Sequence, residues 1–333
     1  MRDLCFCAPG TNRVSRKCAQ KRGFLIIMKY LIIGAGGTGG TIGYYMAKAG
    51  KDVTLIARGE HLLAINKNGL TIEQEWKKST DTIHVNAYTM EDYNDNPDVI
   101  FVCVKGYSLG EVVPFIKRAA KSTTIVIPIL NIYGTGGKLQ KQLPGMLVTD
   151  GCIYVSAYIK KPGMLLQNGA IMRLVYGVRN KEDYRPVLED IKKDLDESGI
   201  EGRLTDDIQK EALEKFSYVS PVGAAGLYHN ATAGDFKQPG AARDTLIEMM
   251  KEITALAKAM GHPFDKDMVE VNLKIMSGLS SDSTTSMQRD VMAGKKSEVD
   301  GLVYEVVRLG EQYGVDVPAY KKAADKLKTQ VAE

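Results

Sequence analysis

A glycine-rich turn near the start of the sequence has the residue types and spacing of a phosphate-binding loop. It follows an apolar strand predicted over residues 30–33, carries Gly34, Gly36 and Gly39 as Gly-x-Gly-x-x-Gly, and leads into helical spacing. These glycines would allow a tight turn, a close backbone approach to a pyrophosphate, and close packing of the helix on the strand. Free N–H groups at the helix N-terminus, that of Gly37 included, would face the phosphates. Because glycine-rich turns are common, the glycines alone also fit an ordinary turn.

The charge at the end of the next strand indicates which dinucleotide would bind. The apolar run 53–57 ends at Arg58, about 20 residues beyond the glycines, where a carboxylate usually holds the ribose 2′-OH of NAD. A guanidinium can instead bind a 2′-phosphate through charge-assisted contacts. The sequence therefore favours NADP(H) over NAD(H). The alternative is a solvated arginine at a strand end.

Two polar side chains follow the later predicted strands. Lys105 comes directly after the apolar strand predicted over residues 97–104, and Asn131 after the strand predicted over 123–130. Ligands of open parallel sheets bind at the carboxyl ends of the strands. Both residues are therefore candidates for contact with cofactor or substrate, although each alone could be a solvated loop residue.

The second half of the chain adds a lysine and a serine–acid cluster. Lys215 lies in a helical stretch and, taken alone, is more typical of a surface position. Ser286 and Asp290 are four residues apart and share one helical face, with Glu298 soon after. A serine at such a place, Ser286 or Ser297, could also simply cap a helix.

The order of elements predicts two domains. Strands alternate with helices up to about residue 205, which indicates a mostly parallel, doubly wound sheet. One of these strands is predicted over residues 153–159, and one of the helices over 108–120, with Ser108 as N-cap and Glu111 at the capping-box position. Later helices are predicted over residues 208–228, 241–260, 266–278, 298–313 and 318–331. We expect a Rossmann-like NADP-binding domain over 28–206 and an all-helical substrate domain over 207–333.

Composition excludes several classes of function. The 333 residues are 44% hydrophobic and 25% charged, which is ordinary for a globular protein, and no apolar run reaches the roughly 18 residues of a membrane span. The net charge is +4, but residues 1–27 alone contribute +5, so it does not indicate nucleic-acid or membrane binding. We expect 1–27 to be a disordered extension of the reading frame upstream of Met28.

The cysteines and histidines indicate the redox state of the protein and whether it could bind a metal. Cys103 and Cys152 lie in apolar strand patterns and are interpreted as reduced core thiols of a cytoplasmic protein. The four histidines lack metal-ligand spacing, so we predict no metal site. The sequence leaves the oligomeric state open and admits a homodimer.

Taken together, these motifs resemble those of the ketopantoate reductases, from Met28 to about residue 332. The residues that carry the resemblance are Gly34, Gly36, Gly39, Arg58, Lys105, Asn131, Lys215, Thr285, Ser286, Met287, Asp290 and Glu298. The resemblance implies reduction of a 2-oxo acid by NADPH, with ketopantoate to pantoate in pantothenate biosynthesis as the leading reaction.

The resemblance also implies roles for individual residues. Lys215 would be the general acid, and Glu298 would orient it or the substrate hydroxyl and also contact the cofactor. Ser286 would bind the substrate carboxylate, with Asp290 beside it. A second set would hold cofactor or substrate: Asn131, Lys105 and, at the 2′-phosphate, Arg58.

The sequence departs from the family pattern at two positions after the lysine. The family usually has asparagines four and eight residues beyond it, where this chain has Val219 and Gly223. Ser220 could replace one amide in part, and Pro221 could kink the helix. Because a pocket without such polar partners discriminates differently, another 2-oxo acid or opine-type dehydrogenase, or a non-catalytic NADP sensor, stays open.

Overall fold

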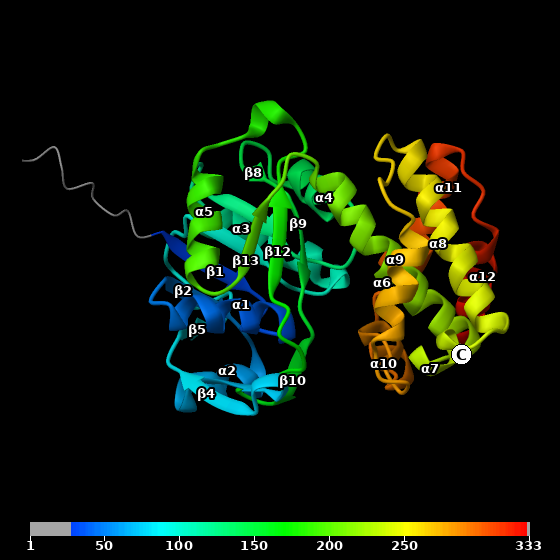
Figure 1. Cartoon of the computed structure of the whole chain (residues 1–333). Helices are drawn as coiled ribbons and strands as arrows, with labels where there is room; N and C mark the ends of the chain where they lie inside the picture. Colours follow the sequence, from blue (N-terminus) through cyan, green and yellow to red (C-terminus); the bar gives the residue numbers. More distant parts are fainter. Residues whose placement is uncertain (1–27, 332–333) are drawn as a thin grey trace, which may run out of the picture.

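Six parallel strands form the centre of the first half of the molecule (Figure 1). This computed structural model describes residues 28–331, so the expectations about residues 1–27 lie outside it. The strands follow the order β5-β2-β1-β6-β7-β8. They are β1 (Lys29–Ile33), β2 (Asp52–Ile56), β5 (Asn86–Tyr88), β6 (Val99–Val102), β7 (Ile125–Pro128) and β8 (Leu147–Val148).

Both faces of this sheet are buried, because side chains alternate along each strand. On β1, Tyr30 and Ile32 pack into one apolar cluster, whereas Leu31 and Ile33 pack into another on the opposite face. The helices that follow the strands are α1 (Gly37–Lys48), α2 (Gly59–Asn68), α3 (Leu109–Ala119) and α4 (Thr135–Gln142). The doubly wound arrangement expected from the sequence is confirmed.

Two smaller sheets complete this half. One has the order β10-β11-β3-β4 and the other β13-β12-β9. Their strands are β3 (Leu70–Gln74), β4 (Ser79–Ile83), β9 (Asp150–Tyr154), β10 (Ala157–Lys161), β11 (Met164–Gln167), β12 (Arg173–Gly177) and β13 (Glu201–Leu204), with α5 (Val187–Glu197) between the last two. The turns η1 (Glu75–Lys77), η2 (Gly106–Ser108) and η3 (Lys181–Asp183) are 3₁₀ helices.

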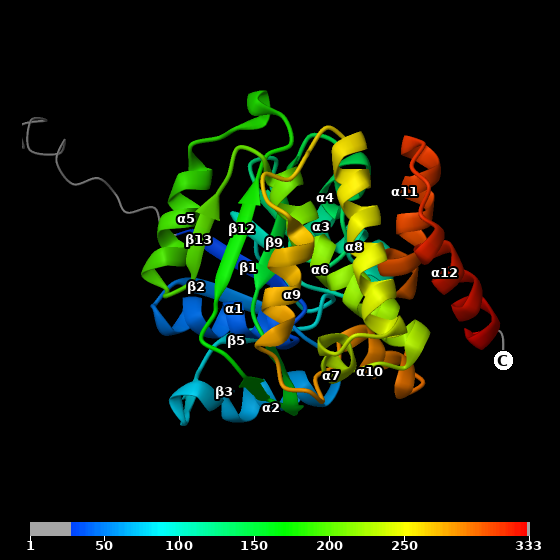
Figure 2. The same cartoon turned by 45° about the vertical axis from the view of Figure 1, so that its right-hand side comes forward.

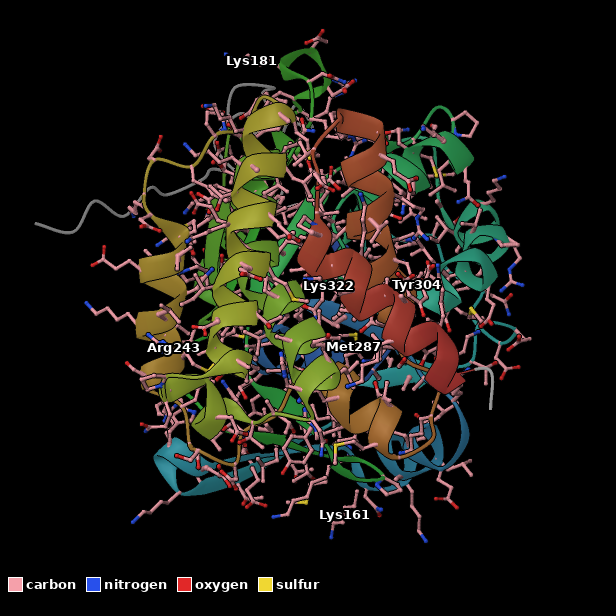
Figure 3. The ribbon with its side chains drawn as sticks, turned by 90° about the vertical axis from the view of Figure 1, so that its right-hand side faces the viewer. Lys161, Lys181, Arg243, Met287, Tyr304 and Lys322 are labelled. Atoms are coloured by element: carbon pink, nitrogen blue, oxygen red, sulfur yellow. The ribbon has the colours of Figure 1, made fainter. Side chains whose placement is uncertain are left out.

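After β13, the described residues form helices only. They are α6 (Ile208–His229), α7 (Ala233–Lys237), α8 (Ala241–Ala259), α9 (Met268–Ser277), α10 (Ser286–Met292), the π-helical turn η4 (Asp300–Tyr304), α11 (Glu305–Tyr313) and α12 (Pro318–Val331). Figure 2 shows α6 running from beside the sheets into these helices, and Figure 3 looks onto α8 and α12 from outside. The predicted fold class, a Rossmann-like domain followed by an all-helical one, is confirmed.

Helix α6 continues through Pro221 because another helix replaces the hydrogen bond that proline cannot make. Proline has no N–H to donate to the carbonyl four residues earlier, that of Ser217. The Asn272 side chain on α9 donates its Nδ2 to this carbonyl at 3.0 Å and is itself only 1% exposed. A side chain of α9 therefore supports the helix that carries Lys215.

Two local expectations need correction. Ser108 precedes α3, but its side chain makes no capping hydrogen bond, because Ser108 ends the turn η2 and is buried there. The strand expected over residues 153–159 is two strands in different sheets, β9 and β10. Within the described part of the chain, no helix is both long and apolar enough to cross a membrane.

Candidate functional site

The glycine turn between β1 and α1 is shaped by contacts that leave no room for side chains, except at one position. Gly34 has a φ of +99°, and a Cβ there would lie 2.9 Å from the carbonyl oxygen of Cys103. A Cβ on Gly39 would clash with the turn itself, and one on Gly37 with the backbone of β10. Around Gly36, a Cβ would meet no heavy atom within 4 Å. The open side of this glycine fits the close approach of a phosphate group.

Arg58 lies where the sequence predicted, directly after β2 and at the N-cap of α2. Its side chain is exposed, and its backbone is extended, with a φ of −146°. A guanidinium at this edge of the sheet is accessible to a phosphate ligand. The geometry therefore fits an NADP cofactor on two counts, the open glycine and the accessible cation.

Lys105 joins the two halves of the molecule. Its Nζ lies 3.0 Å from a carboxylate oxygen of Asp290 and 3.1 Å from one of Glu298, and the N–H of Gly106 donates to the other oxygen of Glu298 at 3.1 Å. Burial alone would lower the pKa of Lys105, but the two carboxylates outweigh it and raise that pKa. Glu298 is only 4% exposed, whereas the side chain of Lys105 is 37% exposed, so the carboxylate of this pair is buried and the lysine reaches solvent.

Lys215, on α6, has a different environment. Its Nζ donates to the amide oxygen of Asn131 at 3.0 Å and lies 5.8 Å from the ring centroid of Tyr154. Burial lowers the pKa of Lys215, and the negative charge of Glu298 opposes that shift. An ammonium held by a neutral amide in a shielded site can release its proton more easily than a surface lysine.

The structure brings most of the predicted site residues together, but some of the side-chain contacts differ from those that the resemblance implies. Glu298 contacts Lys105, whereas the residue that contacts Lys215 is Asn131. Ser286 begins α10 after Thr285, which provides the N-cap and a capping box with Gln288. Lys215 is therefore no ordinary surface residue, contrary to what its helix alone suggested.

Ser220 does not replace a pocket amide. Its hydroxyl is fully buried and donates to the carbonyl of Leu302 at 2.6 Å, while it also bonds the hydroxyl of Tyr320 at 2.5 Å. The serine therefore points into the core of the helical half. Leu302 lies in the π-helical turn η4, so this hydrogen bond joins α6 to η4.

A small pocket next to Lys215 contains residues that the sequence did not single out. Besides Asn131 and Lys215, it is lined by Tyr133, Asp150 and Cys152. Burial raises the pKa of Cys152 to about 11, so its thiol is protonated at neutral pH. Tyr154 and Cys152 were interpreted only as parts of an apolar strand. They lie on β9, beside the helix that carries Lys215, and no local feature of the sequence indicates that position.

Comparisons with known proteins agree with this geometry. The family model described as ketopantoate reductase PanE/ApbA matches residues 30–181, and that of its C-terminal part matches 207–330. An uncharacterized oxidoreductase of Bacillus subtilis is 25% identical over 92% of this chain and all of its own length. A 2-dehydropantoate 2-reductase of Pyrococcus horikoshii is 26% identical over 87% of this chain and 93% of its own.

Solved structures show the same fold. A ketopantoate reductase from Ralstonia eutropha has a TM-score of 0.80 at 23% identity, covering 91% of this chain and 98% of its own. D-mandelate dehydrogenase, solved with NADH and anilino(oxo)acetate, has a TM-score of 0.80 at 20% identity, covering 90% and 96%. The chain belongs to the ketopantoate reductase family of NADP-dependent oxidoreductases.

Proposed function

We propose that this protein reduces a 2-oxo acid to the 2-hydroxy acid with NADPH, and that ketopantoate is the first substrate to test. The observation that carries the proposal is the partly buried Lys215, whose Nζ is held by Asn131 at 3.0 Å in the cleft between the two halves. A shielded ammonium with a lowered pKa suits a group that must give up a proton to a forming alkoxide.

The reaction adds a hydride to the ketone carbon and a proton to its oxygen. NADPH supplies the hydride when bound. Lys215 donates the proton, and its positive charge stabilises the alkoxide as it forms. Asn131 holds the ammonium in one orientation without adding a negative charge that would hold the proton back.

The acidic pair has a separate task in this proposal. Glu298 and Asp290 hold Lys105 at the junction of the two halves, so that the junction keeps one geometry. We propose that Ser286, at the start of α10, binds the substrate carboxylate, as the resemblance implies. The boundary between the two domains is proposed near residue 206, in the connection between β13 and α6.

A second candidate is a 2-oxo acid with an apolar side chain. A Cβ at Gly223 would lie 2.6 Å from Cε of Met287, so this methionine occupies the space that a longer residue would need. Val219 is apolar, and Ser220 is engaged elsewhere. A substrate hydroxyl would therefore find fewer partners along this side of α6, which weakens selection for ketopantoate.

The test is NADPH oxidation with purified protein and a panel of 2-oxo acids. Ketopantoate, 2-oxoisovalerate, phenylglyoxylate and pyruvate differ in the hydroxyl and in the bulk of the side chain. We expect turnover of at least one, with kcat/KM for ketopantoate and 2-oxoisovalerate deciding between the two candidates. A protein that binds NADPH and yet reduces no 2-oxo acid of the panel faster than Lys215→Ala does would contradict the reductase and favour the NADP sensor.

Two properties of the whole protein are part of the proposal. We propose a cytoplasmic location, supported by the interpretation of Cys103 and Cys152 as core thiols. We propose a homodimer, supported by a ketopantoate reductase from Staphylococcus aureus that is described as dimeric, at 21% identity and a TM-score of 0.77. Light scattering at several concentrations tests the second property, because a mass of one chain throughout would exclude it.

A further inference from the structure

His61 connects three segments around the glycine turn. It lies in the first turn of α2, shortly after Arg58. Its Nε2 is 2.9 Å from the carbonyl oxygen of Ala35, and its Nδ1 accepts a hydrogen bond of 3.0 Å from the N–H of Gly163, in the turn between β10 and β11. One imidazole therefore links the glycine turn, α2 and the second sheet.

The two partners fix the protonation state of the ring. Because the N–H of Gly163 can only donate, Nδ1 must be the unprotonated nitrogen. Nε2 then carries the proton and donates it to the carbonyl of Ala35. Burial lowers the pKa of His61, and the hydrogen bond to Ala35 opposes this shift. No charged side chain of the described residues contributes to it, so the neutral ring is favoured.

This arrangement determines where the next N–H points. In a planar trans peptide, the C=O and the following N–H point in opposite directions. With the carbonyl of Ala35 held by His61, the N–H of Gly36 is directed to the other side, away from the ring. The preceding N–H groups, of Gly34 and Ala35, both donate to the carbonyl of Ile56 at the end of β2, at 3.0 and 3.2 Å. The turn is thus fixed from β2 and from α2 together.

We propose that neutral His61 is a positioning residue that directs the N–H of Gly36 toward the pyrophosphate of the cofactor. Gly36 is the one glycine of the motif whose missing side chain faces open space, which is the space the phosphates need. The inference rests on the cofactor site proposed above, but it does not depend on which 2-oxo acid is reduced.

The test is cofactor binding, measured by the fluorescence of bound NADPH and NADH, without substrate. His61→Phe and His61→Leu each remove both hydrogen bonds, and whichever is folded by circular dichroism gives the measurement. We expect NADPH and NADH affinities to fall by the same factor, about 5- to 50-fold, because the pyrophosphate is common to both. In turnover, KM for NADPH should rise while kcat at saturation stays within about threefold.

Three further variants separate positioning from packing. His61→Gln retains one donor and one acceptor and should restore most of the affinity. His84→Leu is the control, because His84 is exposed on another segment. Gly36→Ala adds a methyl group where no protein atom is near, so it should leave the melting temperature unchanged and still weaken both cofactors.

Several results would overturn the inference. Cofactor affinity of His61→Phe or His61→Leu within twofold of wild type would do so, and so would a loss of affinity confined to NADPH. A fall in kcat without a change in KM for NADPH, or a His61→Gln variant that binds cofactor no better than His61→Leu, would do so as well. Unchanged cofactor binding by Gly36→Ala would instead contradict the cofactor site itself. A protein that binds both cofactors as expected but reduces no 2-oxo acid would contradict only the proposed function.

Discussion

The glycine turn and the lysine site, which comprises Lys215, Asn131, Lys105 and Glu298, are built from the chain in different ways. The turn offers backbone N–H groups from residues adjacent in sequence, and its shape follows from glycines that tolerate close contacts. The lysine site is made of side chains that are far apart in sequence. Lys215 and Asn131 are separated by 84 residues, and Lys105 and Glu298 by 193. A site made from local backbone is readable as a motif, whereas a site made from distant side chains depends on the packing of both halves.

The sharpest test of this difference is removal of Lys215. If proton donation depends on this one side chain, Lys215→Ala should lower kcat by roughly 10²- to 10⁴-fold, the usual scale for a positioned proton donor. NADPH affinity should change little, because the proposed sites for the pyrophosphate and the 2′-phosphate lie in the other half. Steady-state kinetics and NADPH fluorescence titration measure the two effects separately.

A matched control lies on the same helix. Lys210, whose side chain is 20% exposed, pairs with the exposed Asp265 at 2.6 Å, so Lys210→Ala removes a lysine of α6 without touching the lysine site. We expect it to change kcat by less than about twofold, as most surface substitutions do. A Lys215→Ala enzyme with turnover within threefold of wild type would remove Lys215 from the mechanism.

The next effect in size concerns Arg58 in the other region. Arg58→Ala should weaken NADPH binding by about 10- to 100-fold, because one charge-assisted contact to the 2′-phosphate is lost. NADH has no 2′-phosphate and should bind as before. Dissociation constants of both cofactors for wild type and variant provide the measurement. Equal affinity of the wild type for NADPH and NADH would show that Arg58 does not select the cofactor.

The sequence predicted the two regions to different degrees. The strand, glycine turn and charged strand end were visible because they are local and obey simple steric rules. The pairing of Glu298 with Lys105 rather than Lys215 was not visible, since both lysines are compatible with an acidic partner until α10 and the strand ends are packed together. For the same reason, the sequence could not tell that Ser220 faces the helical core.

The sheet β10-β11-β3-β4 shows another limit of prediction from the sequence. β4 consists mainly of polar, exposed residues, so it has no apolar pattern from which a strand can be predicted. β3 does alternate, with Leu70 and Ile72 buried on one face, and this signal could have been used. β10 overlaps the strand predicted over residues 153–159, but its residues are mostly exposed, and its separate pairing with β11 could not be predicted from them. Short strands of this kind depend on tertiary pairing more than on their own propensity.

Helix α6 gives a stability test of the same contrast, because even its backbone depends on a distant side chain. Asn272→Leu would leave the buried carbonyl of Ser217 without a donor and should destabilise the protein by about 1–3 kcal/mol, measured by chemical denaturation. In a Pro221→Ala background, residue 221 has an N–H again, so the same substitution should cost clearly less. Equal losses in both backgrounds would show that Asn272 acts by packing alone.

The smallest expected effect is a shift in the pH dependence of turnover. Lys215, the proposed acid, can donate a proton only when it is protonated, so kcat should fall as the pH rises through its pKa. Because burial lowers that pKa, the fall should occur below the ordinary lysine value of about 10.4. Asn131→Leu removes the acceptor that favours the ammonium and should move the fall to lower pH. Asn131→Asp places a negative charge beside the ammonium and should move it to higher pH. The two variants change the same contact in opposite directions, so their shifts should have opposite signs. Shifts of the same sign would mean that the fall in kcat reports the titration of another group, and Lys105 with its two carboxylates would be the next candidate.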